Sequence, residues 1–439
     1  MTEPVTTSAA TSAADSVLDR ARAVLKVGPG EARPLALSFA YFFCVLAAYY
    51  IVRSVRDEIG VQLGKDLQAK LYSVVFVVML LAVPLFGWIV TRFPRRQIVP
   101  ILHGFFILNL LLFWMAFRGG VQSPTLQAMF YVWVSSFNVF VVSLFWSTMS
   151  ELWSSDQAKR LYGVVAAGGT AGVFCGPLLA GLLVGVLGPT NLLLVSATLL
   201  ALGVLIAHWL RADPTTKTDQ SVAEAPTLST ILSGAVNVFK SPYLLSIATV
   251  MFIINLVGTF FYLEQSRIVG EAGMTAVERV QFFARMDLIG AVLQILAQIF
   301  LTGRIIERLG LGVAACALPL AAGIGLLILS RYDTLAAVAG VVAMQRAIGY
   351  GISTPAMRVF FTVLPAEDKY KAQNFIDTVV FRGGDATGGW IFGPVAKHFA
   401  MSLSSVALLT LPLVGLWGWL VLRQGQVHAS KTSVTAKPY

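Results

Sequence analysis

Long apolar segments without charged residues recur along almost the whole chain. Residues 161–187 and 190–210, for example, contain no aspartate, glutamate, lysine or arginine. An α-helix of about 20 predominantly apolar residues is long enough to cross the hydrocarbon core of a bilayer. Charged residues make up 12% of this chain of 439 residues, whereas they make up about 25% of a soluble domain. The chain is therefore predicted to be an all-α polytopic membrane protein.

The apolar segments fall into two sets of six, which predicts about twelve transmembrane helices. The first set comprises residues 35–56, 70–91, 98–117, 126–150, 161–187 and 190–210. The second set comprises residues 242–264, 281–303, 309–330, 334–358, 373–398 and 402–423. We therefore expect an N-terminal tail (1–34), an N-terminal six-helix half (35–210), a cytoplasmic linker (211–241), a C-terminal six-helix half (242–423) and a C-terminal tail (424–439).

The distribution of basic residues predicts the orientation in the membrane. Lysine and arginine are more numerous in the loops on the side of the two termini than in the opposite loops, as is typical of cytoplasmic loops. Residues 1–14 lack the apolar core of a secretory signal peptide, which favours a bacterial inner membrane over an organelle-targeted precursor. Residues 15–26 are expected to be either a short amphipathic helix on the membrane surface or a disordered tail.

Cysteine, histidine and net charge exclude several other classes of function. Cys44, Cys175 and Cys316 lie far apart in apolar segments, and the 4 histidines have no paired spacing, so neither a disulfide framework nor a metal site is predicted. The net charge of +10 is explained by basic loops rather than by nucleic-acid binding. Without a catalytic constellation, neither enzymatic activity nor a cofactor is expected. We expect a monomer in the lipid bilayer.

Two sequence matches at nearly the same offset indicate an internal duplication. Gly87 and Arg92 correspond to Gly303 and Arg308, which lie 216 positions later. The segment from Thr170 to Pro177 also corresponds to Thr387–Pro394, at an offset of 217 positions. A duplicated transporter generally binds its substrate between the two halves.

The pattern Gly-x-x-x-(Asp/Glu)-Arg resembles the loop signature of the major facilitator superfamily. The second copy carries Glu307 at the acidic position, whereas the first copy carries a threonine. This resemblance implies that neighbouring helices approach closely at the two glycines, and that the arginines meet acidic groups or lipid phosphates. The candidate gating and structural residues are Asp57, Gly87, Arg92, Gly303, Glu307 and Arg308.

Ionisable residues within the predicted helices are the strongest indication of a binding site. Each costs about 2.5–3.5 kcal/mol at the centre of a transmembrane helix, so such residues must pair with one another or face water. They are Arg53, Arg56, Asp57, Glu151, Glu264, Arg285, Asp287, Arg346, Asp377, Arg382 and Asp385. From these we select as substrate-binding candidates Arg53, Arg56, Glu151, Glu264, Arg346, Arg382 and Asp385.

Two positions among these candidates leave specific alternatives open. Arg382 and Asp385 are three residues apart on one helix face, so they form either a structural ion pair or a pair that lines the cavity. Arg346 has no acidic neighbour on its own helix. Its partner is expected to be an anionic substrate, Glu264 or Asp385. The glycines at 168, 169, 172 and 176 lie inside a helix, so close helix packing explains them better than phosphate binding.

A more specific resemblance follows from the end of the fourth predicted helix. The segment from Leu144 to Gly163, with Glu151 and Lys159-Arg160, resembles the ATP/ADP translocase type of nucleotide transporter found in plastids and obligate intracellular bacteria. Ile51–Asp57 is also similar to a motif of that family. The resemblance implies that Arg56, Glu151 and Glu264 take part in transport. The eleventh predicted helix departs from the family pattern, because it carries Arg382-Gly-Gly-Asp385 in place of the family's Gly-Lys-Ser-Gly-Gly. The negative charge of Asp385 would repel a polyanionic nucleotide.

The expected function is secondary active transport of an anionic solute by alternating access. A nucleotide in ATP/ADP-type exchange is the first candidate, with Arg53, Arg56, Arg346 and Arg382 attracting the anion. Glu151, Glu264 and Asp385 are expected to pair with these arginines between substrate-bound states. The alternatives are a proton-coupled carrier of another small solute, with Glu264 or Asp385 carrying the proton, a lipid flippase, or a non-transporting sensor on the same fold.

Overall fold

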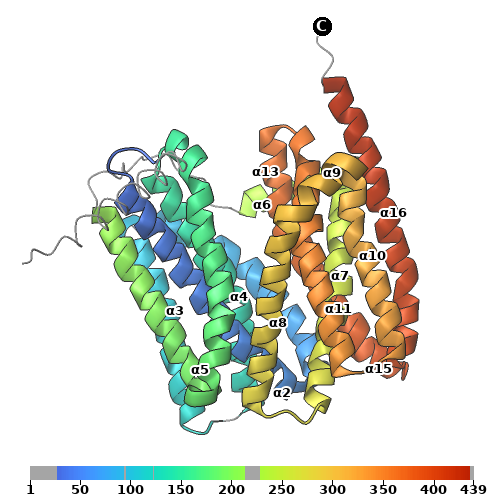
Figure 1. Ribbon diagram of the computed structural model, residues 1–439, viewed down its shortest axis with the longest axis horizontal. Coiled ribbons are helices and arrows are strands. Elements are labelled where there is room, and N and C mark those ends of the chain that lie inside the picture. The colour runs from blue at the N-terminus through green and yellow to red at the C-terminus, as the bar shows by residue number, and fades with distance from the viewer. Residues whose placement is uncertain (1–26, 93–94, 122, 213–227, 436–439) are drawn as a thin grey trace, which may run out of the picture.

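The computed structural model describes residues 27–92, 95–121, 123–212 and 228–435, and these ranges contain helices but no β-strand. The predicted helix at residues 15–26 lies outside the described residues. The all-α polytopic fold is confirmed, and it is built as two helical bundles that lie side by side in Figure 1.

Two very long helices in the N-terminal half each contain two of the predicted transmembrane segments. Helix α2 (Ala32–Arg92) has a non-helical residue at Gly64, and α5 (Ser155–Ala212) has one at Gly188, both with φ near 76°. Glycine adopts this left-handed conformation readily because it has no Cβ atom. Each glycine therefore divides its helix into two spans, and α3 (Arg95–Arg118) and α4 (Pro124–Leu152) complete this half.

The C-terminal half is more interrupted. Its longer helices are α7 (Pro242–Glu271), α8 (Ala276–Ala297), α10 (Leu311–Arg331), α11 (Leu335–Ile348) and α16 (Leu403–Thr435). Shorter helical pieces are α6 (Leu228–Lys240), α9 (Gly303–Leu309), α12 (Thr354–Val359), α13 (Ala366–Phe375), α14 (Phe381–Trp390) and α15 (Ala396–His398). Stretches of π-helix join several of them at Gln298–Thr302, Gly349–Ser353, Ile376–Val380 and Ile391–Val395, and a 3₁₀ turn lies at Phe360–Val363.

Nine helices in the described ranges are long and apolar enough to cross a membrane. Two of these nine are α2 and α5, each of which supplies two spans. The predicted segment 373–398 is not among the nine, and it is the segment that carries Asp377, Arg382 and Asp385. Two π-helical stretches lie within it, one on either side of α14. Such π-bulges are frequent at functional sites.

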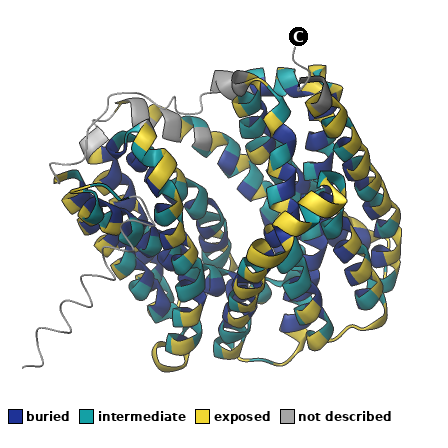
Figure 2. Cartoon of the chain, turned by 45° about the horizontal axis from the view of Figure 1, so that its top comes forward, coloured by how far each residue is buried: buried dark blue, intermediate teal, exposed yellow. Residues whose placement is uncertain are grey.

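Each half has its own hydrophobic core. Phe130, Phe137 and Phe145 are fully buried in the first core, whereas Phe260 and Trp417 are buried in the second. Large hydrophobic side chains remain exposed on most of the long helices, and Figure 2 shows exposed residues along their outward faces. This distribution is expected for a protein whose outer surface contacts lipid tails.

Glycines set the same helix packing in both halves. A Cβ atom on Gly172 in α5 would lie 2.6 Å from the carbonyl oxygen of Phe43 in α2. In the C-terminal half, a Cβ atom on Gly388 in α14 would lie 2.8 Å from the carbonyl oxygen of Leu256 in α7. In the sequence repeat Gly172 corresponds to Gly389, the residue that follows Gly388, so the close contacts lie at nearly equivalent positions of the two halves. The prediction that these glycines pack helices is confirmed.

Gly303 differs from its predicted role. It follows a π-helical stretch at the exposed end of α8, and no atom lies within 4 Å of the Cβ position that a larger residue would add. The expectation that this glycine lets helices approach closely is therefore wrong. Glu307 and Arg308 are exposed in α9, and Arg92 is exposed at the end of α2, where Gly87 also lies.

The predicted linker 211–241 contains a folded helix in its second part. Helix α6 packs on α13, where Asn237 Nδ2 donates a hydrogen bond to Asp368 Oδ1 at 2.9 Å. Gly234 lies so close to the carbonyl oxygen of Lys371 that a Cβ atom would be only 2.2 Å from it. This part of the linker is thus attached to the C-terminal half.

Candidate functional site

Three charged residues from three helices lie at the same depth in the fold. Arg53 precedes the break at Gly64 by eleven residues, and Asp287 and Arg346 follow the first residues of α8 and α11 by eleven residues each. At about 1.5 Å per residue this distance is about 16 Å. Since the hydrocarbon core is about 30 Å thick, these residues lie near its middle.

Threonine caps explain why α8 and α11 begin where they do. The Thr275 side chain accepts a hydrogen bond from the Glu278 N–H, and Glu278 bonds back to the Thr275 backbone in a capping box. Thr334 caps α11 in a similar way by accepting from the Ala337 N–H. Both helices thus start at defined residues and bring Asp287 and Arg346 to the same level.

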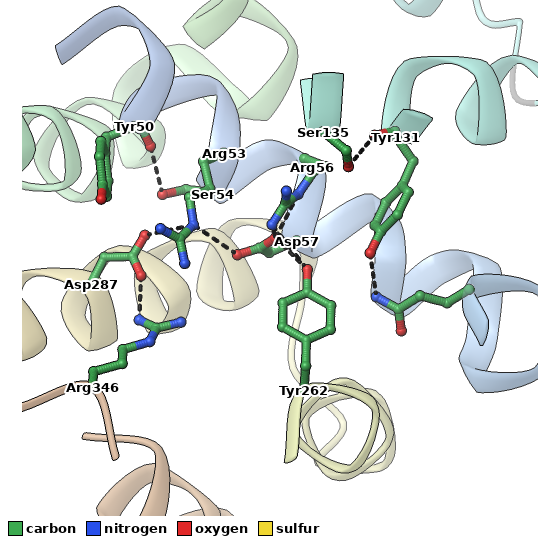
Figure 3. Close-up of polar contacts among 11 residues, drawn as sticks. Tyr50, Arg53, Ser54, Arg56, Asp57, Tyr131, Ser135, Tyr262, Asp287 and Arg346 are labelled. Atoms are coloured by element: carbon green, nitrogen blue, oxygen red, sulfur yellow. Dashed lines mark hydrogen bonds and ion pairs between the residues drawn. The ribbon is translucent and has the colours of Figure 1, made fainter. Parts of the chain in front are cut away.

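Asp287 bridges two arginines that come from different halves (Figure 3). Its Oδ1 accepts a hydrogen bond from Arg346 Nη1, and its Oδ2 lies 3.5 Å from Arg53 Nε. The Asp287 side chain is only 2% exposed, so its charge is sheltered from bulk water. The α2 helix of the N-terminal half is in this way connected to α8 and α11 of the C-terminal half.

A second carboxylate, Asp57, holds Arg56 beside the first pair. Arg56 Nε donates to Asp57 Oδ1 at 2.9 Å, and the Tyr262 hydroxyl donates to the same oxygen at 2.6 Å. The Arg56 guanidinium also lies 5.5 Å from the ring centre of Tyr131 and 5.8 Å from that of Tyr262. Aromatic faces attract cations at such distances, so tyrosines support the arginine on two sides.

We define the central site as Arg53, Arg56, Asp57, Asp287 and Arg346. It contains three positive and two negative side chains. Three of its buried polar atoms, Arg53 Nε, Asp57 Oδ2 and Asp287 Oδ2, make no hydrogen bond within the described part of the chain. Arg53 Nε lies between the two oxygens, at 3.9 Å from Asp57 Oδ2 and 3.5 Å from Asp287 Oδ2. Buried polar atoms normally have partners, and leaving one without costs about 1–3 kcal/mol. The central site therefore retains capacity to bind a polar ligand.

The predicted pair Arg382–Asp385 is confirmed as a contact in α14. Arg382 Nη1 donates to Asp385 Oδ2 at 3.3 Å, and the Thr259 hydroxyl of α7 donates to Asp385 Oδ1 at 3.4 Å. Gly384 and Gly388 make this approach of α14 to α7 close enough for the Thr259 contact. Both charged side chains remain partly exposed.

Three of the predicted pairings differ from the structure. Glu151 pairs with Arg211 at 3.4 Å, and Glu264 pairs with Lys65 and with Arg267, so neither contacts the four selected arginines. Arg346 contacts neither Glu264 nor Asp385. From the sequence, Asp287 is among the ionisable residues of the predicted segment 281–303 but not among the substrate-binding candidates. Because α8 begins at Ala276, Asp287 lies deeper than expected, and the Thr275–Glu278 capping pattern is the signal that locates it.

A second group of charges joins the halves at the end of the fold away from Ala32 and Thr435, which we call the distal side. This distal cluster comprises Lys65, Asp66, Glu264, Arg267, Asp333 and Lys397. Lys65 of α2 bonds to Glu264 of α7, and Lys397 of α15 bonds to Asp66 of α2. Arg267 holds Glu264 at 2.8 Å and Asp333 at 2.6 Å. A cavity of about 340 Å³ lies among these six residues, with Phe392 and Met401 in its apolar wall.

One further ion pair crosses between the halves near the distal cluster. Arg279 Nη2 of α8 donates to Glu58 Oε1 of α2 at 2.9 Å, and the Glu58 side chain is 2% exposed. The contacts between the halves on the distal side therefore include both buried and exposed ion pairs.

Asp377, an ionisable residue of the eleventh predicted helix, pairs with Arg358 in a partly exposed position.

Comparison with known proteins gives a consistent result for the fold. Residues 35–389 match the profile of the Major Facilitator Superfamily. No curated protein matches the chain.

Solved structures of transporters have the same fold. The nucleoside transporter NupG is 14% identical, with a TM-score of 0.62 over 90% of this chain and 99% of that chain. A bacterial homologue of the iron transporter ferroportin in an inward-facing state is 13% identical, with a TM-score of 0.64 over 90% and 98%. A bacterial homologue of the human lysosomal transporter Spinster, inward-facing and unoccupied, is 13% identical, with a TM-score of 0.58 over 92% and 98%. At these identities the likeness concerns the fold.

Proposed function

Because the chain belongs to the Major Facilitator Superfamily, we propose that it is a secondary active transporter of a small anionic solute, which binds at the central site. The observation that carries this proposal is the bridge from Arg53 through Asp287 to Arg346. An anion that takes the place of Asp287 would contact guanidinium groups of both halves. Arginine is suited to this role because its planar donors match carboxylate and phosphate groups.

Alternating access requires the contacts on the distal side to open and close. The buried pairs Lys65–Glu264 and Glu58–Arg279 join the halves there, so they are the proposed distal gate. With both termini in the cytoplasm of a bacterium, this gate faces the outside of the inner membrane and is closed in this conformation. Two of the similar structures are inward-facing transporters, which supports this orientation. A monomer suffices for this mechanism.

The resemblance to the ATP/ADP translocase type makes nucleotide exchange one reaction to test, whereas the charge balance of the central site, argued below, favours a monovalent anion. Exchange needs no titrating group, because one anion replaces another on the arginines. Proton-coupled transport is the second candidate, and Asp385 is its better carrier. Glu264 is held by two cations, Lys65 and Arg267, whereas Asp385 faces one arginine and one hydroxyl.

Uptake into proteoliposomes tests the proposal. The purified protein is reconstituted, and uptake of labelled ATP, phosphate and a panel of organic anions is measured with and without the same anion inside. We expect at least one anion to accumulate, and R346Q to lower its uptake by about tenfold, which corresponds to the loss of a charge-assisted hydrogen bond. The control is D156N, which changes one exposed carboxylate far from the central site.

The outcomes separate the alternatives. Uptake of ATP that depends on internal ADP supports nucleotide exchange. Uptake of another anion that is driven by an inward proton gradient supports proton coupling. If no anion is taken up, or if R346Q transports as well as the unchanged protein, the assignment of the central site to an anionic solute is wrong.

A further inference from the structure

The charge balance of the central site supports an inference about the substrate, which rests on the proposed function and extends it. We propose that the transported solute carries a single negative charge and that Asp287 sets this selectivity. Asp57 pairs closely with Arg56 and lies 3.9 Å from Arg53, whereas Asp287 is shared between Arg53 and Arg346, so two carboxylates face three guanidinium groups. The central site therefore has one positive charge in excess. Arg382 and Asp385 add one charge of each sign and leave this balance unchanged.

Arg53 is held less firmly than the other two arginines of this site. Its Nε lies 3.5 Å from Asp287 Oδ2 and 3.9 Å from Asp57 Oδ2, and it donates a hydrogen bond to neither oxygen. A ligand carboxylate or comparable anion would give Arg53 Nε the acceptor that it lacks. Arg346, by contrast, is firmly bonded to Asp287 Oδ1. The anion is thus expected to enter on the Arg53 side, between the two halves.

The physical cost of an unmatched charge favours a monovalent anion. A ligand with one negative charge neutralises the one excess positive charge of the central site. A dianion would leave one negative charge, and a nucleoside diphosphate or triphosphate would leave more. Uncompensated charges are expensive in a low-dielectric interior, so each further charge on the ligand should weaken binding. The central site is thus expected to distinguish anions by their charge.

Matched anions of the same carbon skeleton test this selectivity in the unchanged protein. Butyrate is compared with succinate, and 2-methylbenzoate with phthalate, each at pH 7.5, with ADP as a polyanion. Equilibrium dissociation constants are measured on purified protein by titration calorimetry. We expect the monoanion of any pair that binds to be favoured over its dianion by about tenfold or more, which is about 1.4 kcal/mol. Succinate, phthalate or ADP binding more tightly than the monoanions would overturn the inference.

Substitution of Asp287 makes the test independent of ligand shape. D287N raises the excess charge of the site to two, so preference should shift by about tenfold toward the dianion of the same pair. The double variant D287N/R346Q returns the excess to one and should restore preference for the monoanion. Thermal unfolding of each variant verifies that it is folded, and D156N is the control, since it makes the same change in net charge on an exposed surface.

The results distinguish this inference from the proposed function. If no anion in the panel binds the unchanged protein, the central site does not bind anions and the proposed function fails with it. If anions bind but D287N and D287N/R346Q leave the ratio between monoanion and dianion unchanged, anion binding stands and selection by charge balance is wrong. If D287N does not fold, the comparison of mono- and dianions in the unchanged protein decides.

Discussion

The Tyr262 hydroxyl of α7 donates a hydrogen bond of 2.6 Å to Asp57 Oδ1 of α2, and this bond connects the two halves beside the central site. Asp57 is almost completely buried, so its charge depends on the groups that surround it. Tyr262 also accepts a bond from Arg56 at 3.2 Å. The tyrosine therefore positions a carboxylate and an arginine of the opposite half at the same time.

Replacing this tyrosine tests its positioning role. Y262F removes the donor to Asp57 and should destabilise the protein by about 1.5–3 kcal/mol, the usual worth of a hydrogen bond to a charged group. Anion binding should weaken as well, because Arg56 loses part of its support. Thermal unfolding and calorimetric titration measure the two effects. The control is Y370F in α13, whose side chain is exposed, and equal stability of the two variants would contradict the prediction.

The distal cluster offers two ion pairs that differ mainly in burial. E264Q removes a carboxylate that is 2% exposed, whereas D66N removes one that is 49% exposed. Because exposed pairs contribute only about 0–1 kcal/mol, D66N should have little effect. E264Q leaves Lys65 and Arg267 without this partner and should open the distal side more often.

Labelling of an introduced cysteine reports this opening. Met401 lies in the wall of the distal cavity, so M401C in a background without the native cysteines provides the probe. We expect E264Q to raise the rate of maleimide labelling severalfold and D66N to leave it nearly unchanged. Equal rates in the two variants would show that the Lys65–Glu264 pair does not hold the distal side closed.

The glycine contacts predict a clear difference between two alanine substitutions. In G172A the new methyl group would lie 2.6 Å from the carbonyl oxygen of Phe43, so α5 must move away from α2. Overpacking of this kind costs about 1–3 kcal/mol. G340A places a methyl group in open space on α11 and should be neutral or slightly stabilising, since alanine favours helices. Thermal unfolding of both variants decides, and similar losses of stability would contradict the packing argument.

Much of the fold could be predicted from the sequence because lipid restricts the chain to a few solutions. Hydropathy located the helices, including the two spans within α2 that are divided at Gly64. The Arg382–Asp385 contact followed from helical spacing alone. These predictions succeed because each depends only on residues that are close together in the sequence.

The partners of the central arginines could not be predicted in the same way. Arg53 and Asp287 are more than 200 positions apart, and their contact depends on how the two halves pack. Hydropathy also placed the start of α8 too late, since the polar first turn with Glu278 is not apolar enough to count as membrane helix. Of the distal cluster, only Glu264 is among the residues selected from the sequence. The other charges lie near helix ends, breaks or loops, where ionisable residues are common and give no signal.

The Arg382–Asp385 pair allows a structural contact to be separated from a role in transport. D385N leaves Arg382 without its carboxylate and removes the acceptor charge for the Thr259 hydroxyl, so both stability and uptake should fall. The exchange R382D/D385R retains two opposite charges three residues apart on the same helix. It should restore much of the stability, since the pair can still form.

Uptake should not recover in the exchanged variant, because the positive and negative groups have moved by nearly one helical turn. Arginine at position 385 also cannot accept the hydrogen bond from Thr259, and it would lie where a carboxylate now faces α7. Thermal unfolding and proteoliposome uptake of both variants provide the measurements. Recovery of stability and uptake together would assign this pair to structure alone, whereas recovery of stability without uptake places it among the residues that act on the transported anion.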